Sequence, residues 1–294
     1  MKFQRKTRSG FARKDLLAIV ACVFVLGLLQ VVVRGDVRSR SRLAACLANF
    51  DQLALGWLMY SGDNDEKLVW NPESGTAGKI AGSPSWAGGW EDYSISNPDN
   101  TNSALLVDHG SPAGQFGALL GSYVRRNPSL FRCPDDPIYL TISGKSYPRV
   151  RSVSMNGYMN GYRASGAQNS WSSGSYINFR TLGDFARLKP SEAYVFTEER
   201  EDSLNDCVLN VDLPKDLSLN NVLTPGSFSM VDYPAGRHDR GCVFSFADGH
   251  VEYWRWADAR TTPTLRPGEL LTLNVSMPNN PDVARLALAT SRAR

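Results

Sequence analysis

The sequence has few of the residues from which catalytic and metal sites are commonly built. It contains only three histidines and five cysteines among 294 residues. No two cysteines have CxxC spacing, and no P-loop, HExxH motif or nucleophile elbow is present. The sequence therefore predicts neither an enzyme nor a zinc site.

Excess positive charge is also missing from most of the chain. Ten of the 32 basic side chains but only three of the 29 acidic ones fall in the first 51 residues, so the net charge from Gln52 onward is −4. Nucleic-acid binding needs Lys and Arg clustered on one face. We therefore expect no nucleic-acid partner, and we assign the basic N-terminus to the inner membrane surface.

One apolar run, Leu16–Val33, has no charge along 18 residues. About 20 apolar residues cross the hydrocarbon core of a bilayer. No small-x-small cleavage site follows, as it would in a secretory signal peptide. Basic residues before the run outnumber those after it and favour a cytoplasmic N-terminus. We expect a single-pass inner-membrane protein whose residues 63–294 form a head in the periplasm or outside the cell.

The helical pattern continues beyond the membrane segment. Apolar side chains recur at helical spacing along one stripe, at Leu43, Cys46, Leu47, Phe50, Ala54, Trp57 and Leu58. Helix-breaking residues follow at 61–65. We expect one helix from about residue 12 to 61, with its part at 11–33 in lipid and an amphipathic stalk at 34–62.

The segment 238–256 is predicted to contain a β-hairpin. Strand-forming residues flank Asp248-Gly249, a two-residue turn signal. That turn would pair Phe244 with Tyr253 and present an apolar face to the stalk helix. Together with a buried strand expected at 193–197, the pattern predicts an α+β fold: a long N-terminal helix packed on an antiparallel β-sheet head.

Three stretches resemble one family. Gly10-Phe11, the acidic Asp15 and the apolar run resemble the type IV prepilin signal of pilins and type II secretion pseudopilins. Residues 46–60 resemble the stalk of the large pseudopilin-like families of planctomycetes and verrucomicrobia. His238, followed after nine residues by Asp248-Gly249, matches their His-x9-Asp-Gly signature.

The resemblance implies a pilin-like fold and a structural function. A prepilin peptidase would remove the leader 1–10 by cutting after Gly10 and would methylate Phe11. Asp15 would then pair with the N-terminal amine of a neighbouring pilin-like subunit in a type II secretion or type IV pilus-like filament. The sequence departs from the family in having Asp15 where glutamate is usual and 12–14 as Ala-Arg-Lys, so an unprocessed signal-anchor helix is the alternative.

Two other functions remain open. The first is a membrane-anchored module that binds a glycan or peptide without polymerising. Its binding platform would draw on the tryptophans Trp86, Trp90, Trp171, Trp254 and Trp256. The second is an exported hydrolase that uses the region of His238 and Asp248, although no nucleophile is apparent. Alternatively Asp248 is a turn residue and His238 an anchor at the strand entry, rather than part of a metal or ligand site with His250.

The densest acidic segment, 198–206, is a candidate calcium site with Glu199, Asp202 and Asp206 as ligands. Calcium takes several carboxylate and carbonyl oxygens from flexible loops, and the resemblance to major pseudopilins favours such a site. A solvated acidic loop is the alternative. Cys46 and Cys133 form the first candidate disulfide, since it would fasten a loop to the stalk helix, and two reduced buried thiols are the alternative.

Overall fold

The computed structural model describes residues 13–73, 76–81, 83–111, 115–163, 176–213, 225–266 and 268–294. It divides into two compact units, Met1–Ala44 and Ala45–Arg294. The predicted leader and the Gly10–Phe11 pair lie outside the described residues, as do the side chains of Asp15 and of most of the apolar run. Among the helices that are described, none has the length and apolar content needed to cross a bilayer.

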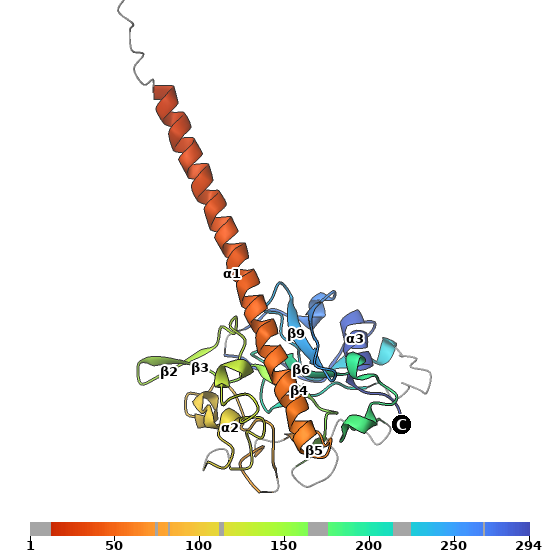
Figure 1. Cartoon of the computed structure of the whole chain (residues 1–294). Helices are drawn as coiled ribbons and strands as arrows, with labels where there is room; N and C mark the ends of the chain where they lie inside the picture. The colour runs from red at the N-terminus through yellow and green to blue at the C-terminus, as the bar shows by residue number, and fades with distance from the viewer. Residues whose placement is uncertain are drawn as a thin grey trace, which may run out of the picture. The chain divides into compact units, whose positions relative to one another are not determined.

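Helix α1, Arg13–Asp63, is a single helix of 51 residues, labelled in Figure 1. From Ala45 on it belongs to the second unit and packs on that unit's sheet. The predicted stripe is confirmed, because Cys46, Phe50, Ala54 and Trp57 are buried. The helix ends where predicted. Left-handed backbone follows it at residues 65 and 66, and the amide of residue 66 donates to the carbonyl of residue 61.

Five strands form the central sheet, in the order β10-β9-β6-β4-β7. Their bounds are β4 Val153–Asn156, β6 Tyr194–Glu198, β7 Val208–Leu209, β9 Gly241–Phe246 and β10 Val251–Arg255. Every residue of β6 is buried, which confirms the strand expected there. The sheet is mixed, whereas an antiparallel sheet was predicted, because β7 runs parallel to β4. Strands β4 and β6 are antiparallel. After β6 the chain crosses to the other edge of β4 and forms β7 there, and β7 therefore runs parallel to β4.

The predicted hairpin is present, but its predicted register is wrong by one residue. Phe244 pairs with Glu252, and Val243 pairs with Tyr253. The loop has three residues rather than two. Gly249 ends it with a positive φ of 95° and donates its amide to the carbonyl of Phe246. A type I turn followed by one left-handed residue gives this three-residue loop and shifts the pairing.

The register determines which aromatic rings share a face. Phe244 stacks on Trp254 with ring centroids 4.2 Å apart, and Arg285 of helix α3, Pro281–Thr290, lies 3.7 Å from the Trp254 ring centroid. The Phe244 face therefore packs toward α3, and not toward the stalk helix as predicted. Both Trp254 and Trp256 are buried in this packing.

Short elements complete the second unit. Three two-stranded pairs join β1 to β5, β2 to β3 and β8 to β11. The bounds of these elements and of the remaining α-helix are β1 Asn71–Glu73, α2 Ala104–Val107, β2 Tyr139–Ile142, β3 Lys145–Pro148, β5 Gly161–Arg163, β8 Ser229–Met230 and β11 Val275–Ser276. The 3₁₀ helices are η1 Pro98–Thr101, η2 Pro128–Phe131, η3 Leu182–Asp184, η4 Pro190–Glu192, η5 Pro225–Ser227 and η6 Ala259–Thr261.

Candidate metal centre

Four potential metal ligands from distant parts of the sequence meet in the interior of the second unit. They are Cys46, Cys133, Glu198 and His238, and all four are buried. One ligand atom from each lies within 4.8 Å of the ligand atoms of the other three. In the described residues this is the one group of three or more His, Cys, Asp or Glu side chains close enough to share an ion.

The two cysteines reach the cluster from the helix and from a loop. Cys46 lies on the buried stripe of α1, while Cys133 follows η2. The amide of Cys133 donates to Ser152 Oγ at 2.8 Å, and Cys133 Sγ accepts from the amide of Asp135 at 3.3 Å. Cys46 and Cys133 are both free thiols, so the disulfide predicted between them is not formed in this structure.

Glu198 is the last residue of β6 and is fully buried. Its Oε2 accepts a hydrogen bond from the amide of Val243 at 2.9 Å. Its Oε1 accepts no hydrogen bond and lies 3.6 Å from His238 Nε2 and 3.9 Å from Arg237 Nη1. One lone-pair site of a buried carboxylate therefore faces the cluster without a hydrogen-bond donor.

His238 lies three residues before the start of β9, and its two ring nitrogens have different surroundings. Nε2 lies 3.3 Å from Cys133 Sγ, on the side of the cluster, and Nδ1 faces Asp135 Oδ2 at 3.2 Å. The backbone is held on both sides, since the amide donates to the carbonyl of Gly241 and the carbonyl accepts from the Tyr253 hydroxyl. Nε2 therefore faces the cluster, while Nδ1 lies close to a carboxylate without making a hydrogen bond in this geometry.

These contacts shift the pKa values of the cluster residues. Burial lowers the pKa of His238, but its close contacts with Cys133 and Glu198 and the charge of Glu198 outweigh this effect and raise the pKa to about 10. Burial acts to raise the pKa of Glu198, yet His238 and Arg237 bring it below its usual value. The hydrogen bond between the thiols lowers the pKa of Cys133 and raises that of Cys46. The contact between His238 and Glu198 therefore raises the pKa of the imidazole and lowers that of the carboxyl.

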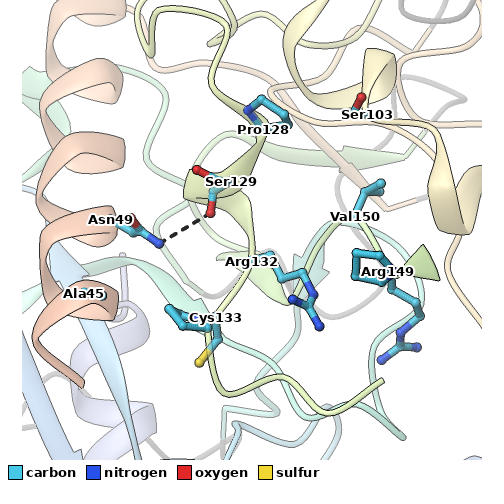
Figure 2. A pocket seen from close by; sticks show the side chains of 11 residues that line it. Ala45, Asn49, Ser103, Pro128, Ser129, Arg132, Cys133, Arg149 and Val150 are labelled. Carbon is cyan, nitrogen blue, oxygen red and sulfur yellow. Dashed lines mark hydrogen bonds between the residues drawn. The ribbon is translucent and has the colours of Figure 1, made fainter. Parts of the chain in front are cut away.

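A cavity of about 530 Å³ lies next to the cluster. Cys133 forms part of its wall, and Figure 2 shows the sulfur of this residue beside α1 and η2. Across the cavity mouth, Asn49 of α1 donates to the carbonyl of Ser129 at 3.4 Å. Arg132 and Arg149 contribute charge to the lining. Of the four cluster residues, Cys133 is the one that lines this cavity.

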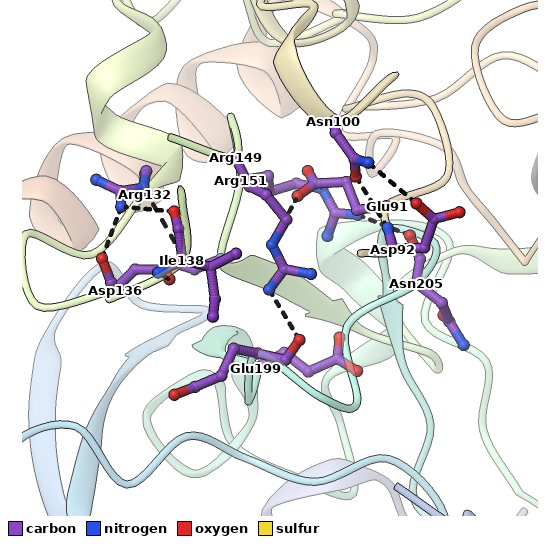
Figure 3. Close-up of polar contacts among 12 residues, drawn as sticks. Glu91, Asp92, Asn100, Arg132, Asp136, Ile138, Arg149, Arg151, Glu199 and Asn205 are labelled. Atoms are coloured by element: carbon purple, nitrogen blue, oxygen red, sulfur yellow. Dashed lines mark hydrogen bonds and ion pairs between the residues drawn. The ribbon is translucent and has the colours of Figure 1, made fainter. Parts of the chain in front are cut away.

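A second buried network lies around Glu91 and is drawn in Figure 3. Its carboxylate oxygens lie 3.6 Å from Arg151 Nε and 3.9 Å from Arg149 Nε. Arg151 also donates to the carbonyl of Asp206 at 2.7 Å, and Arg149 donates to the carbonyl of Glu201 at 2.8 Å. The arginines therefore hold the backbone of the acidic segment 198–206 inside the head.

The three predicted calcium ligands each have protein partners. Glu199 accepts from Ser154 Oγ at 2.5 Å and Ser203 Oγ at 2.9 Å, and its pKa is raised to about 8, mainly by burial. Asp202 pairs with Arg200. Asp206 Oδ1 accepts the amide of Val208 at 3.0 Å. The structure does not bring these carboxylates together as one ligand set, and the calcium site stays a prediction.

The other residues singled out from the sequence also have definite places. Asp248 and His250 pair with each other at the hairpin turn, with Asp248 Oδ1 2.5 Å from His250 Nδ1. His238 belongs to the separate buried cluster, so the three do not form the predicted alternative site. Trp86 is buried and Trp90 is 38% exposed. Trp171 lies outside the described residues.

Glu198 is the residue of the cluster that sequence reasoning did not single out as a ligand. The sequence analysis did propose that Cys46 and Cys133 lie close together, as a disulfide, and it considered His238 separately. No local motif connects these four positions, because they come from α1, the loop after η2, the end of β6 and the entry to β9. No protein-family model, curated protein or solved structure matches the chain.

Proposed function

We propose that the protein is a pseudopilin-like structural subunit of a type II secretion or type IV pilus-like filament, and not an enzyme. A prepilin peptidase would process it at Gly10–Phe11. The first half of its N-terminal helix would hold it in the inner membrane, with the head in the periplasm or outside the cell. Its partners would be the membrane, the peptidase and other pilin-like subunits.

One observation carries the proposal. Helix α1 has 51 residues, and among its described side chains only those from Cys46 on are buried in the head. Packing therefore accounts for the apolar stripe in the second part of the helix. It does not account for the uncharged run Leu16–Val33, whose composition suits a lipid environment. A helix with its first part in lipid and its second part packed on the head is what a pilin-like subunit needs, and the two sequence patterns along α1 support that proposal.

Exposed side chains of α1 offer a contact surface to a neighbouring subunit. Leu55 is 56% and Met59 is 48% exposed, and they lie four residues apart on one side of the helix. Trp57 between them points into the core. Burying these two side chains against a second pilin-like helix would remove apolar surface from water.

Cross-linking in membranes of the native host tests this assembly. In a Cys22→Ala background, which removes the exposed native thiol, we expect Leu55→Cys and Met59→Cys to give cross-linked multimers. Ile80→Cys is the matched control, because Ile80 is 46% exposed but does not lie on α1. Monomers alone in all three variants would contradict the filament model.

A membrane-anchored glycan- or peptide-binding module is the second candidate. Trp70, 43% exposed, and Trp90 are the tryptophans in the described residues that offer such a platform. Binding of a glycan or peptide library that is lost in Trp90→Ala, together with the absence of cross-linked multimers, would favour this second function.

A further inference from the structure

We propose that Cys46, Cys133, Glu198 and His238 bind one Zn²⁺ ion that fastens helix α1 to the sheet of the head. The ion would be structural, since four protein ligands complete the tetrahedral coordination that zinc prefers. This inference is independent of the filament proposal, because it concerns the interior of the unit Ala45–Arg294 alone.

The donor atoms are those that zinc takes. Two thiolates, one imidazole nitrogen and one carboxylate oxygen all occur as zinc ligands. Bonds of about 2.0–2.3 Å in a tetrahedron place neighbouring ligand atoms about 3.3–3.8 Å apart. The contact of His238 Nε2 with Cys133 Sγ is 3.3 Å and its contact with Glu198 Oε1 is 3.6 Å. The remaining separations, up to 4.8 Å, would have to shorten on zinc binding.

The buried Oε1 of Glu198 is the observation that points to a ligand. This oxygen is fully enclosed and accepts no hydrogen bond, although its partner oxygen is paired with the amide of Val243. A buried charged group without a hydrogen bond is destabilising. A cation at the centre of the cluster would satisfy that oxygen directly.

The surroundings also fit a zinc-bound histidine. Zinc-bound histidines commonly give their other ring N–H to a carboxylate, which fixes the tautomer and the ring orientation. Asp135 Oδ2 faces His238 Nδ1 at 3.2 Å and is placed for this function. Nε2 then holds the lone pair that points toward the thiols and Glu198.

The charges balance within the site. Binding forms two Zn–S bonds, one Zn–N bond and one Zn–O bond, and any proton that a ligand atom carries is released to solvent, because each ligand binds in its deprotonated form. The ion with two thiolates, one carboxylate and a neutral imidazole carries a net charge of −1. Arg237, with Nη1 3.9 Å from Glu198 Oε1, offsets part of that charge and also pairs with Glu201 at 3.0 Å. The cavity lined by Cys133 is the side of the cluster from which an ion would enter.

A disulfide between Cys46 and Cys133 would exclude the ion, because oxidation consumes both sulfur ligands. The zinc-bound chain and the chain with a disulfide can be distinguished in the same purified protein. Zinc binding keeps both cysteines reduced and places the metal at one ion per chain, whereas the disulfide leaves the chain without metal.

The experiment uses the full chain, purified under reducing conditions in detergent, incubated with excess Zn²⁺ and then desalted. Mass spectrometry of the metal content should give one zinc per chain. Loading with Co²⁺ instead should give the thiolate-to-cobalt charge-transfer band and the visible bands of tetrahedral cobalt. We expect Cys133→Ser and His238→Ala to lower the metal content at least about tenfold.

Controls separate metal binding from folding. Cys207→Ser removes a buried thiol outside the cluster, and His250→Ala removes the histidine at the hairpin turn; both should keep the metal. Glu198→Gln keeps the shape of the side chain and should retain the folded circular dichroism spectrum while losing affinity. Failure of the reduced wild-type chain to retain Zn²⁺ or Co²⁺ would overturn the proposal, as would metal content unchanged in both Cys133→Ser and His238→Ala.

Discussion

Two buried tryptophans give a matched test of how the head is held together. Trp57 on α1 and Trp86 both have no exposed surface. Trp86 Nε1 donates to Asn71 Oδ1 at 3.0 Å, whereas Trp57 Nε1 has no hydrogen-bond partner. Replacing each with phenylalanine removes similar volume but different hydrogen bonding. The two substitutions should therefore differ in their effect on the free energy of unfolding.

The magnitudes follow from the separate contributions. The lost volume destabilises each variant by about 1–2 kcal/mol. Trp86→Phe also leaves buried Asn71 Oδ1 without its donor, which adds about 1–3 kcal/mol and gives about 2–5 kcal/mol in total. Trp57→Phe removes an N–H that no acceptor satisfies. That gain offsets the lost volume, so its net effect should stay within about 1 kcal/mol.

Urea unfolding of the full chain in detergent, followed by far-ultraviolet circular dichroism, measures the difference. Leu55→Ala serves as a control on α1, because Leu55 is 56% exposed and its truncation should change the free energy of unfolding by less than about 0.5 kcal/mol. If Trp57→Phe destabilises the chain as much as Trp86→Phe, the assigned hydrogen bonding of the core is refuted.

Further outcomes concern Glu91 and Gly249. Burial raises the pKa of Glu91 to about 7, against the opposing charges of Arg151 and Arg149. The contribution of protonated Glu91 to the free energy of unfolding is therefore fully present below pH 4.5 and lost as the pH rises through 7. The loss is about 3 kcal/mol. Glu91→Gln should remove this pH dependence when urea midpoints at pH 5 and 8 are compared. Gly249→Ala should lower the free energy of unfolding by about 1–2 kcal/mol, because φ there is +95°, whereas Gly226→Ala should not. Equal effects of the two glycine substitutions, or an unchanged pH dependence in Glu91→Gln, would contradict these assignments.

Helical periodicity predicted α1 well because the pattern and the packing share one cause. Cys46, Phe50 and Trp57 recur at the spacing that turns them to one side, and that side is buried. The end of the helix was equally readable, since the residues after it favour left-handed backbone.

Strand pairing was harder to predict because it depends on single residues. The Asp248-Gly249 step fits a two-residue turn, yet the chain uses three loop residues with Gly249 last, and every cross-strand partner moves by one. Strand β7 has only two residues, and its parallel pairing with β4 left no periodic signal. Both corrections come from tertiary pairing that local sequence does not encode.

The proposed metal centre gave no local sequence signal for a related reason. Zinc sites are recognised in sequences by closely spaced ligands, and the absence of CxxC spacing argued against one here. Cys46, Cys133, Glu198 and His238 come together only when the helix, the loop after η2 and the sheet pack. Of the four, His238 already carried a sequence signal, through the His-x9-Asp-Gly spacing.

The mass of the N-terminus of the membrane-associated protein from its native host tests the central claim most directly. The filament model predicts a chain that begins at methylated Phe11, since the leader would be removed by a prepilin peptidase. A chain that still carries Met1 to Gly10 would contradict it. The membrane-anchored binding module would then be the better account.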